Sequence, residues 1–299
     1  MTETGSKFLL LSFLLLSGVA CDAGQTSEEP LGTGGTTTQP GTGGTPGSNG
    51  GTNASGGTGS SGMPTLQGQT ITGQYDSMLV THDGRQYVVQ NNVWGAGAQQ
   101  TLVVAGTAFE VTRQTGNNPT NGAPVSYPSV FIGSNYNRMT SGSNLPKQVS
   151  AITSIDTSWT HNAGSVSGTY NAAYDVWFST SAGGDPESPT GGYLMVWLHD
   201  PPNAQPIGSV MASGVTIPGV SGTWDVWVGP NGNRPCISYV SKQTIPSLTF
   251  DLNLFIQDAV NNRPNTIQAS WYLTNVFAGF EIWSGGVGLR TDDFYAIVN

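Results

Sequence analysis

Carboxyl side chains that could donate or accept a proton are sparse after residue 63, and the glutamates among them are Glu110, Glu187 and Glu281. Glu187 lies in a run rich in glycine and proline, which is typical of a solvated loop, and no motif surrounds Glu110. Glu281 stands alone among apolar residues and beside glycines, which allow another stretch of chain to approach closely. Desolvation at such a position raises the pKa of a carboxyl group, as a general acid requires, so Glu281 is the candidate proton donor.

A second signal is the alternation of side chains along residues 193–199, which predicts a strand. One face carries the core residues Leu194, Val196 and Leu198, and the other carries large amphipathic residues: Tyr193, Met195, Trp197 and His199. Aromatic rings stack on the apolar faces of sugar rings, and polar tips bind sugar hydroxyls. The alternative is that both faces are buried between two sheets, and these residues alone favour neither interpretation.

The run Ala173–Phe178 predicts another strand, with Asp175 and Trp177 on the same face. An aspartate inside an apolar strand is costly to bury unless it is hydrogen-bonded. Asp175 is therefore either a functional carboxylate or a structural one whose hydrogen bonds are satisfied.

The composition argues against several classes of partner. Charged residues make up 9% of the chain and the net charge is −9, without a basic patch, so nucleic acid is not expected as a partner. His82, His161 and His199 are far apart and lack ligand spacing, so we expect no metal site. No glycine-rich phosphate loop precedes a helix, and we expect no cofactor. We expect a monomer.

The first residues have the layout of an export signal. Lys7 is followed by the apolar run Phe8–Leu16 and then by small residues, and this run is too short to span a membrane. Cys21 directly after Ala20 resembles the lipobox of bacterial lipoproteins, although Gly18 stands where leucine is usual. We expect residues 1–21 to direct export and Cys21 to carry lipid, which gives a cell-surface lipoprotein. The alternative is ordinary signal cleavage and a secreted protein.

Residues 22–63 consist mainly of glycine, threonine, serine and proline, and cannot bury enough apolar surface to fold. We expect this segment to be a flexible tether between the anchor and a folded domain at residues 64–299. Cys236 is the only other cysteine, so lipidation of Cys21 would leave it without a disulfide partner. We expect Cys236 to be a small buried apolar side chain.

Short runs rich in β-branched and aromatic residues predict strands separated by glycine, asparagine and proline clusters. These runs are Tyr87–Val89, Thr101–Val104, Ser129–Ile132, Ala173–Phe178, Leu194–Leu198, Thr223–Val228, Ile237–Val240, an interrupted Ala269–Phe280, and Asp293–Val298. The mixed spacing of Asp251–Asn261 predicts the one helix. The fold class is therefore all-β, a two-sheet β-sandwich with a single helix packed on it.

Several of these runs together resemble glycoside hydrolase family 12, the small jelly-roll endo-β-1,4-glucanases and xyloglucanases. The similar elements are Asn91–Gly95, Tyr127–Gly133, Leu145–Pro146, Ala173–Phe178, Trp271–Leu273 and Gly279–Trp283, and they occur in the family's order. The resemblance covers about residues 67–299. It implies a jelly roll with a concave glycan-binding cleft and a β-1,4-glucan as substrate: cellulose, mixed-linkage glucan or xyloglucan.

The resemblance also implies roles for single residues. Glu281 takes the acid/base position, and Asp175 takes that of the aspartate that hydrogen-bonds the nucleophile. The substrate-binding positions it implies are Asn92, Trp94, Met195, Trp197 and Trp283. Asn92 and Trp94 correspond to residues that line the glycone side of the cleft.

One position departs from the family pattern. The family's nucleophile strand begins with glutamate and continues with an aliphatic residue, methionine, an aliphatic residue and tryptophan, whereas this chain has Tyr193 in place of the glutamate. A retaining mechanism needs an anionic group about 5 Å from the acid, and a tyrosine with a pKa near 10 is a poor substitute, although sialidases use one.

Three interpretations follow from this departure. The chain could bind β-glucan and hydrolyse it poorly or not at all, as a non-catalytic surface lipoprotein would. It could be a hydrolase with a rearranged site in which Glu187, Asp200 or Tyr193 supplies the missing function. It could catalyse another reaction on a glycan. The substitution favours loss of most hydrolytic activity.

Overall fold

The computed structural model describes residues 66–183 and 189–299. The compact unit that contains them runs from Thr65 to Asn299. The predicted export signal, Cys21, the tether and Glu187 lie outside the described residues, so the interpretations attached to them stay predictions.

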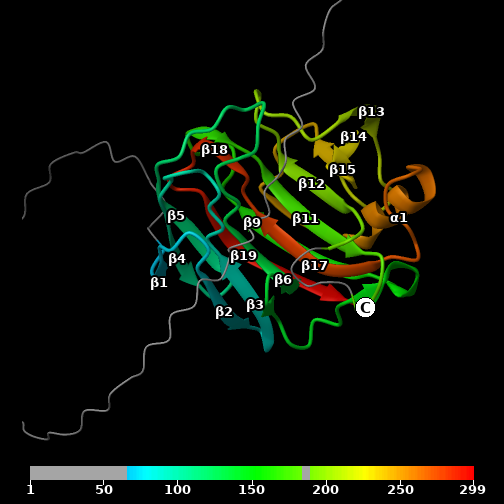
Figure 1. The fold of residues 1–299 in the computed structure, drawn as a ribbon, viewed down its shortest axis with the longest axis horizontal. Helices are drawn as coiled ribbons and strands as arrows, with labels where there is room; N and C mark the ends of the chain where they lie inside the picture. The colour runs from blue at the N-terminus through cyan, green and yellow to red at the C-terminus, as the bar shows by residue number, and fades with distance from the viewer. Residues whose placement is uncertain (1–65, 184–188) are drawn as a thin grey trace, which may run out of the picture. The chain divides into compact units, whose positions relative to one another are not determined.

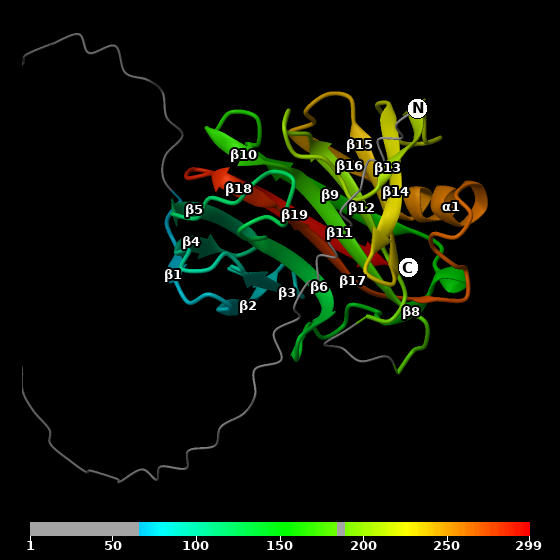
Figure 2. The same ribbon diagram turned by 45° about the horizontal axis from the view of Figure 1, so that its top comes forward.

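Two large β-sheets form the fold, as Figures 1 and 2 show. The six-stranded sheet has the spatial order β1 (Gln69–Ile71), β4 (Gln100–Ala105), β5 (Ala108–Gln114), β19 (Arg290–Val298), β9 (Ile155–His161) and β16 (Ser247–Asp251). The eleven-stranded sheet runs through β13 (Ser209–Val215), β14 (Trp224–Asn231), β15 (Arg234–Ser241), β12 (Tyr193–His199), β11 (Ala172–Ser179), β17 (Tyr272–Gly279), β6 (Ser129–Asn135), β3 (Arg85–Gln90) and β2 (Ser77–His82). Its remaining strands are β7 (Arg138–Met139), beside β6, and β8 (Lys147–Gln148), beside β17.

A small two-stranded sheet joins β10 (Gly168–Tyr170) to β18 (Ile282–Gly285). Within the described residues the chain has one α-helix, α1 (Asn253–Asn262), which follows β16, and one 3₁₀ turn, η1 (Val149–Ala151). The predicted sandwich with one helix is therefore confirmed. The helix begins at Asn253 rather than at Asp251, because Asp251 ends β16 and its carboxylate accepts the N–H of Asn253 (2.9 Å).

Large rings from both sheets meet in the main core. Trp159 of β9 makes an edge contact with Tyr174 of β11, with ring centroids 5.5 Å apart, and a tilted contact with Phe280 at 5.6 Å. All three side chains are fully buried. Burying a large apolar side chain stabilises a fold by about 1.5–3 kcal/mol, so these contacts help to hold the two sheets together and fix the position of Phe280, next to Glu281.

Every strand that the sequence predicted is present, and most extend one to three residues beyond the predicted run. The interrupted run Ala269–Phe280 is a turn followed by β17, and it ends at Gly279. The strands that were not predicted are β1, β2, β5, β7, β8, β9, β10, β13, β16 and β18.

Candidate active site

Strands β11 and β12 are antiparallel neighbours, and their register places the predicted residues side by side. Asp175 is opposite Met195, Trp177 is opposite Tyr193, and Ala173 is opposite Trp197. Side chains on alternate positions of the two strands therefore point to the same face of the sheet. The pairing brings together residues that lie some twenty positions apart in the sequence.

The two faces of β12 belong to different apolar clusters. Leu194, Val196 and Leu198 join the main core, together with residues of the six-stranded sheet. Tyr193, Met195 and Trp197 join a second cluster, whose other members are Ala173, Ala204, Cys236, Val240 and Trp283, with Trp177 and Trp227 packed against it. No residue of the six-stranded sheet belongs to this second cluster. The side chains of Tyr193, Met195 and Trp197 therefore point away from the six-stranded sheet. We call this side of the eleven-stranded sheet the second face.

His199, which strand alternation grouped with Tyr193, lies at the end of β12, where the pairing with β11 is irregular. A register shift at Ala172 and Ala173 changes the pairing at this end of the strand. The His199 ring lies 5.3 Å from the Tyr170 ring, and its Nδ1 is 2.8 Å from Thr244 Oγ1. Burial lowers the pKa of His199.

Glu281 lies between β17 and β18, where alternation turns it to the second face. Its neighbours Phe280 and Ile282 are buried in the main core, while Trp283 belongs to the second cluster. Glu281 itself is partly exposed, so a ligand can reach its carboxyl group. Burial raises the pKa of Glu281 to about 7, and the donated hydrogen bond from Asn171 opposes that rise. Such a group holds a proton near neutral pH, which suits a general acid.

Asn171 holds Glu281 through both its side chain and its backbone. Asn171 Nδ2 donates to Glu281 Oε2 (2.5 Å), and the Glu281 N–H donates to Asn171 Oδ1 (2.9 Å). The Asn171 N–H also donates to the Glu281 carbonyl (3.0 Å). Asn171 was not predicted from the sequence, because a single asparagine just before a strand carries no signal that links it to a residue 110 positions away.

The glycines around Glu281 permit close chain contacts, as predicted. A Cβ on Gly279 would lie 2.4 Å from the Pro128 carbonyl oxygen, and one on Gly285 would lie 2.7 Å from Gly168 Cα. Gly285 also has a φ of +68°, in the left-handed region that favours glycine. Larger residues at these positions would push apart the strands that hold Glu281.

Asp175 is only half satisfied. Its Oδ2 accepts a hydrogen bond from Trp177 Nε1 (2.8 Å). Its Oδ1 is buried and has no hydrogen-bond partner in the described part of the chain. Burial raises the pKa of Asp175 to about 8, and the negative charge of Glu281 adds to the rise. The Trp177 donor and a backbone hydrogen bond from Val176 oppose it.

Tyr193 extends its hydroxyl away from Glu281. Its ring stacks on Trp177, with centroids 4.2 Å apart and planes 17° from parallel, and Asn231 Nδ2 donates to the hydroxyl (2.9 Å). Asn231 ends β14 at the turn into β15, beside the start of β12, whereas Asn171 and Glu281 lie near the end of β12. Burial raises the pKa of Tyr193 above its usual value of 10.

Cys236 lies opposite Tyr193 on the parallel strand β15 and is buried and free. Burial raises the pKa of its thiol to about 12, so the sulfur is an unreactive thiol at neutral pH.

Asn92 and Trp94 lie on a loop that is tied to the Glu281 segment. Trp94 is 41% exposed, and its Nε1 donates to Asn92 Oδ1 (2.9 Å). The Trp94 N–H donates to the Val125 carbonyl (2.7 Å), and the Val125 N–H donates to the Ile282 carbonyl (2.7 Å). Trp94 thus offers an open ring that is connected through Val125 to the residue after Glu281.

Three other predicted contact residues are buried. Met195 is 6% exposed, Trp197 is 1% exposed and Trp283 is 4% exposed. Trp283 Nε1 donates to the Gly122 carbonyl (2.8 Å), whereas Trp197 Nε1 has no partner in the described residues. These buried side chains belong to the second cluster, and the partly exposed Trp177 packs against it.

Comparison with known proteins agrees with this arrangement. Residues 85–299 match the sequence pattern of glycosyl hydrolase family 12. The chain belongs to glycosyl hydrolase family 12. The matched residues therefore include Asp175, Tyr193 and Glu281.

Relatives of this family 12 chain include a Mycobacterium tuberculosis protein named as a probable cellulase. The two sequences are 36% identical over 161 residues, and these residues cover 53% of this chain and 99% of that protein. The xyloglucan-specific endo-β-1,4-glucanase A of Emericella nidulans is 30% identical over 237 residues, 75% of this chain and 89% of that protein. Among solved structures, the endoglucanase of Rhodothermus marinus is 35% identical with a TM-score of 0.69, covering 77% of this chain and 99% of that one.

The other carboxylates weighed from the sequence lie elsewhere in the family 12 fold. Glu110 is on β5 of the six-stranded sheet, where its Oε2 accepts the N–H of Leu66 (2.9 Å). Asp200 follows β12, and the charged groups that act on it are Asp225 and Lys242. Burial raises the pKa of Asp200 to about 6, with a smaller contribution from Asp225. Neither residue is brought to Glu281 by the contacts described.

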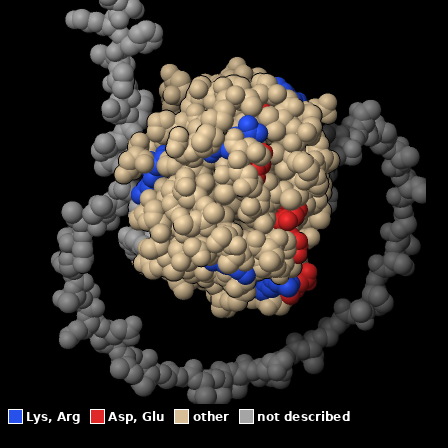
Figure 3. Space-filling model, turned by 90° about the vertical axis from the view of Figure 1, so that its right-hand side faces the viewer, with Lys and Arg blue, Asp and Glu red and all other residues tan. Residues whose placement is uncertain are grey.

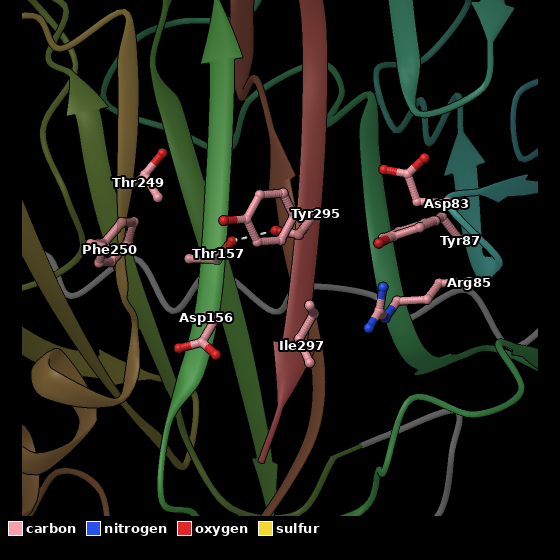
Figure 4. A pocket seen from close by; sticks show the side chains of 9 residues that line it. All are labelled: Asp83, Arg85, Tyr87, Asp156, Thr157, Thr249, Phe250, Tyr295 and Ile297. Atoms are coloured by element: carbon pink, nitrogen blue, oxygen red, sulfur yellow. Dashed lines mark hydrogen bonds between the residues drawn. The ribbon is translucent and has the colours of Figure 1, made fainter.

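A hollow of about 540 Å³ lies away from the second face of this family 12 chain (Figure 4). Residues of β3, β9, β16 and β19 and of the β2–β3 turn line it, among them Arg85, Asp156 and Tyr295. None of the residues predicted to act on a substrate lines this hollow. The candidate active site is therefore placed at Glu281, because its carboxyl group has a pKa suited to proton transfer.

The described residues contain no group of three or more metal-binding side chains and no helix long and apolar enough to cross a membrane. The face seen in Figure 3 carries only scattered charged residues. A surface with so few charges suits a neutral polymer better than a charged one.

Proposed function

We propose that this chain binds β-1,4-glucan along the second face of its eleven-stranded sheet and hydrolyses it slowly. The observation that carries this proposal is Glu281, a partly exposed carboxyl group with a pKa of about 7 on the aromatic face that also holds Asp175. The names of the relatives support the substrate class, because they include a probable cellulase and xyloglucan-specific endo-β-1,4-glucanases.

Tyr193 is the reason we expect slow hydrolysis. A retaining glycosidase needs an anion about 5 Å from its acid. Tyr193 stands at the nucleophile position that the family resemblance implies, its pKa is raised by burial, and its hydroxyl bonds Asn231 on the side away from Glu281. A neutral phenol in that orientation is a poor nucleophile.

Reducing-end release tests the hydrolytic part of the proposal. The full chain, incubated with barley β-glucan, carboxymethyl cellulose or xyloglucan, should release reducing ends slowly, and Glu281→Gln should abolish the release. A flat time course at high protein concentration would argue against hydrolysis.

Native gels that contain the same glucans test the binding part. The chain should be retarded, and Trp94→Ala should relieve the retardation, since Trp94 offers the exposed ring. Tyr136→Ala is a matched control, because Tyr136 is a similarly exposed aromatic residue (49%) on the turn between β6 and β7. No retardation with any of the glucans would contradict the proposal.

The second candidate function is a non-catalytic β-glucan-binding lipoprotein of the bacterial surface. The orientation of Tyr193 favours it, and so does the placement of Cys21 after an export-like segment. It predicts retardation in the gel without any release of reducing ends. Attachment through Cys21 has its own test: the chain should sediment with membranes, and Cys21→Ser should release it.

A further inference from the structure

The outer side of the six-stranded sheet carries a regular array of polar side chains. Strand β9 pairs with β19 on one side and with β16 on the other. The register places Tyr295 and Thr249 on either side of Ser158, in one row across the three strands. Phe294 and Trp159, one position along β19 and β9, are buried in the main core, so alternation turns this row outward.

Hydroxyl groups make up much of this outer array. Ser158 Oγ and Thr249 Oγ1 are 2.8 Å apart, and in the next row Thr160 Oγ1 and Ser247 Oγ are 2.9 Å apart. In each pair one hydroxyl donates to the other, which leaves the second O–H and several lone pairs for a ligand. A surface of this kind suits an uncharged ligand that itself presents a row of hydroxyl groups.

The hollow of about 540 Å³ adjoins the array (Figure 4). Figure 4 shows Tyr295 between Thr249 on one side and Arg85, from β3, on the other. Ile297 and Asp156, which are paired in the next row of β19 and β9, line it as well. The volume falls within the range of about 300–1,000 Å³ that is usual for ligand sites. The hollow therefore combines a half-buried aromatic ring with a hydrogen-bond donor and an acceptor.

The charged groups at the hollow are of both signs. Asp83 and Asp156 carry carboxylates and Arg85 carries a guanidinium group, and all three side chains are exposed. Asp156 Oδ2 accepts one hydrogen bond, from Asn299 Nδ2 (3.0 Å). Arg85 takes part in none of the ion pairs shown among the described residues. Mixed signs give a polyanion no consistent attraction, whereas a neutral polyhydroxyl ligand can accept from Arg85 and donate to Asp156.

A chain of sugar rings matches all of these groups together. The apolar face of a sugar ring stacks on an aromatic side chain such as Tyr295, and its hydroxyls both donate and accept hydrogen bonds. Successive rings of the polymer would then meet the paired hydroxyls of β9 and β16. The main core, which contains residues of both sheets, separates this array from the second face, where Glu281 lies.

We propose that the hollow and the outer side of β9, β16 and β19 form a second binding site for β-1,4-glucan, and the choice of ligand rests on the proposed function. Neither Asp175 nor Glu281 lines this site, so it holds the polymer without cleaving it. A polymer sample that engages both faces is retained more strongly, because the first contact raises the effective concentration of glucan at the second.

The number of bound oligosaccharides tests the proposal. Cellohexaose is titrated into the full chain carrying Glu281→Gln, which prevents cleavage, and calorimetry gives the number of sites per chain. We expect two sites. Trp94→Ala should remove the site on the second face, and Tyr295→Ala should remove the site at the hollow. Tyr295→Phe keeps the ring and should keep both sites.

Asp156→Ala gives a second test that does not disturb the core, because Asp156 is exposed. Loss of a hydrogen bond to its carboxylate should weaken binding at the hollow about tenfold. In native gels with barley β-glucan, Trp94→Ala should relieve the retardation only in part, and adding Tyr295→Ala should lower it at least about tenfold further. Tyr136→Ala is the control, as an exposed aromatic residue outside the array, and should leave both measurements unchanged.

Each outcome of the titration decides the matter. One site that disappears in Trp94→Ala and survives Tyr295→Ala would overturn the second site and leave the proposed function standing. Two sites that both survive Tyr295→Ala and Asp156→Ala would overturn the location at the hollow. One site that disappears in Tyr295→Ala and survives Trp94→Ala would support the hollow and contradict binding on the second face. Absence of any binding would contradict both proposals.

Discussion

Asn171 and Glu281 are joined by three hydrogen bonds, two through the Asn171 side chain and one between backbones. The amide group of Asn171 therefore donates to the carboxyl group of Glu281 and accepts from its backbone N–H at the same time. This double contact fixes the position of Glu281 between β17 and β18, where the sheet ladder itself does not hold it. It also favours the ionised form of Glu281, because the donor stabilises negative charge.

Replacing Asn171 should therefore affect both stability and the pH profile. Asn171→Ala leaves the Glu281 N–H without its acceptor, and an unsatisfied buried donor costs about 1–3 kcal/mol of stability. It also removes the donor that lowers the pKa of Glu281, so Glu281 stays protonated to higher pH and the alkaline limb of the rate profile moves upward. Urea unfolding and a pH–rate profile measure the two effects.

Asn118→Ala is the control for this prediction, because Asn118 Nδ2 makes one exposed hydrogen bond to the Ala123 carbonyl. It should change stability by less than about 0.5 kcal/mol, as most surface substitutions do. An alkaline limb that stays in place in Asn171→Ala would show that the amide does not tune Glu281.

The buried carboxyl groups predict that the fold is more stable in mild acid than at alkaline pH. The folded-state pKa values of Glu281 and Asp175, about 7 and about 8, lie above the ordinary pKa values of these side chains, 4.5 and 3.8. The folded state therefore holds their protons more tightly, and this stabilisation is fully present below about pH 4 and is lost as pH rises through 7 and 8. We expect the free energy of unfolding to fall by several kcal/mol, on the order of 5 kcal/mol, between pH 5 and pH 8.

Chemical denaturation at the two pH values checks this. Glu281→Gln and Asp175→Asn should each reduce the difference, because an amide cannot titrate. Equal stability of the wild-type chain at pH 5 and pH 8 would contradict the argument.

The sequence was sufficient to predict the strands that are rich in apolar residues and the division of β12 into two different faces. Residues 193–199 alternate cleanly, and the structure separates Leu194 and Val196 from Tyr193 and Met195 as expected. Strand β9 was missed because serine and threonine on its outward side weaken the apolar alternation in Ile155–His161. Strand β13 was missed because most of it is exposed.

The contacts that give the site its chemistry could not be predicted in the same way. Asn171 reaches Glu281 across 110 positions, and Asn231 reaches Tyr193 across 38. Both contacts depend on pairings between strands that no local pattern encodes. The sequence showed that Tyr193 departs from the family pattern, but only the parallel pairing of β12 with β15 shows where its hydroxyl points.

Tyr193→Glu should raise glucan hydrolysis at least tenfold, because it restores a carboxylate on the second face next to Asp175. The gain comes with a loss of stability of about 1–3 kcal/mol, since the stacking of Tyr193 on Trp177 is lost and another carboxyl group is buried. Tyr193→Gln is the matched control, with the same length and no charge, and should lose stability without gaining activity. Equal rates in the two variants would show that charge at this position does not limit hydrolysis.

Trp177→Phe tests how the Trp177 indole sets the ionisation of Asp175. The substitution keeps a ring to stack on Tyr193 and removes only the Nε1 donor to Asp175 Oδ2. That donor lowers the pKa of Asp175, so its loss moves the pKa above about 8 and leaves less ionised Asp175 at neutral pH. The rate at pH 7 should fall several-fold, and the acid limb of the kcat/KM profile should move to higher pH. Trp227→Phe is the control, because Trp227 packs on the same face from β14, one strand beyond β15, and should leave the profile in place. A profile that stays unchanged in Trp177→Phe would mean that ionisation of Asp175 does not govern the reaction.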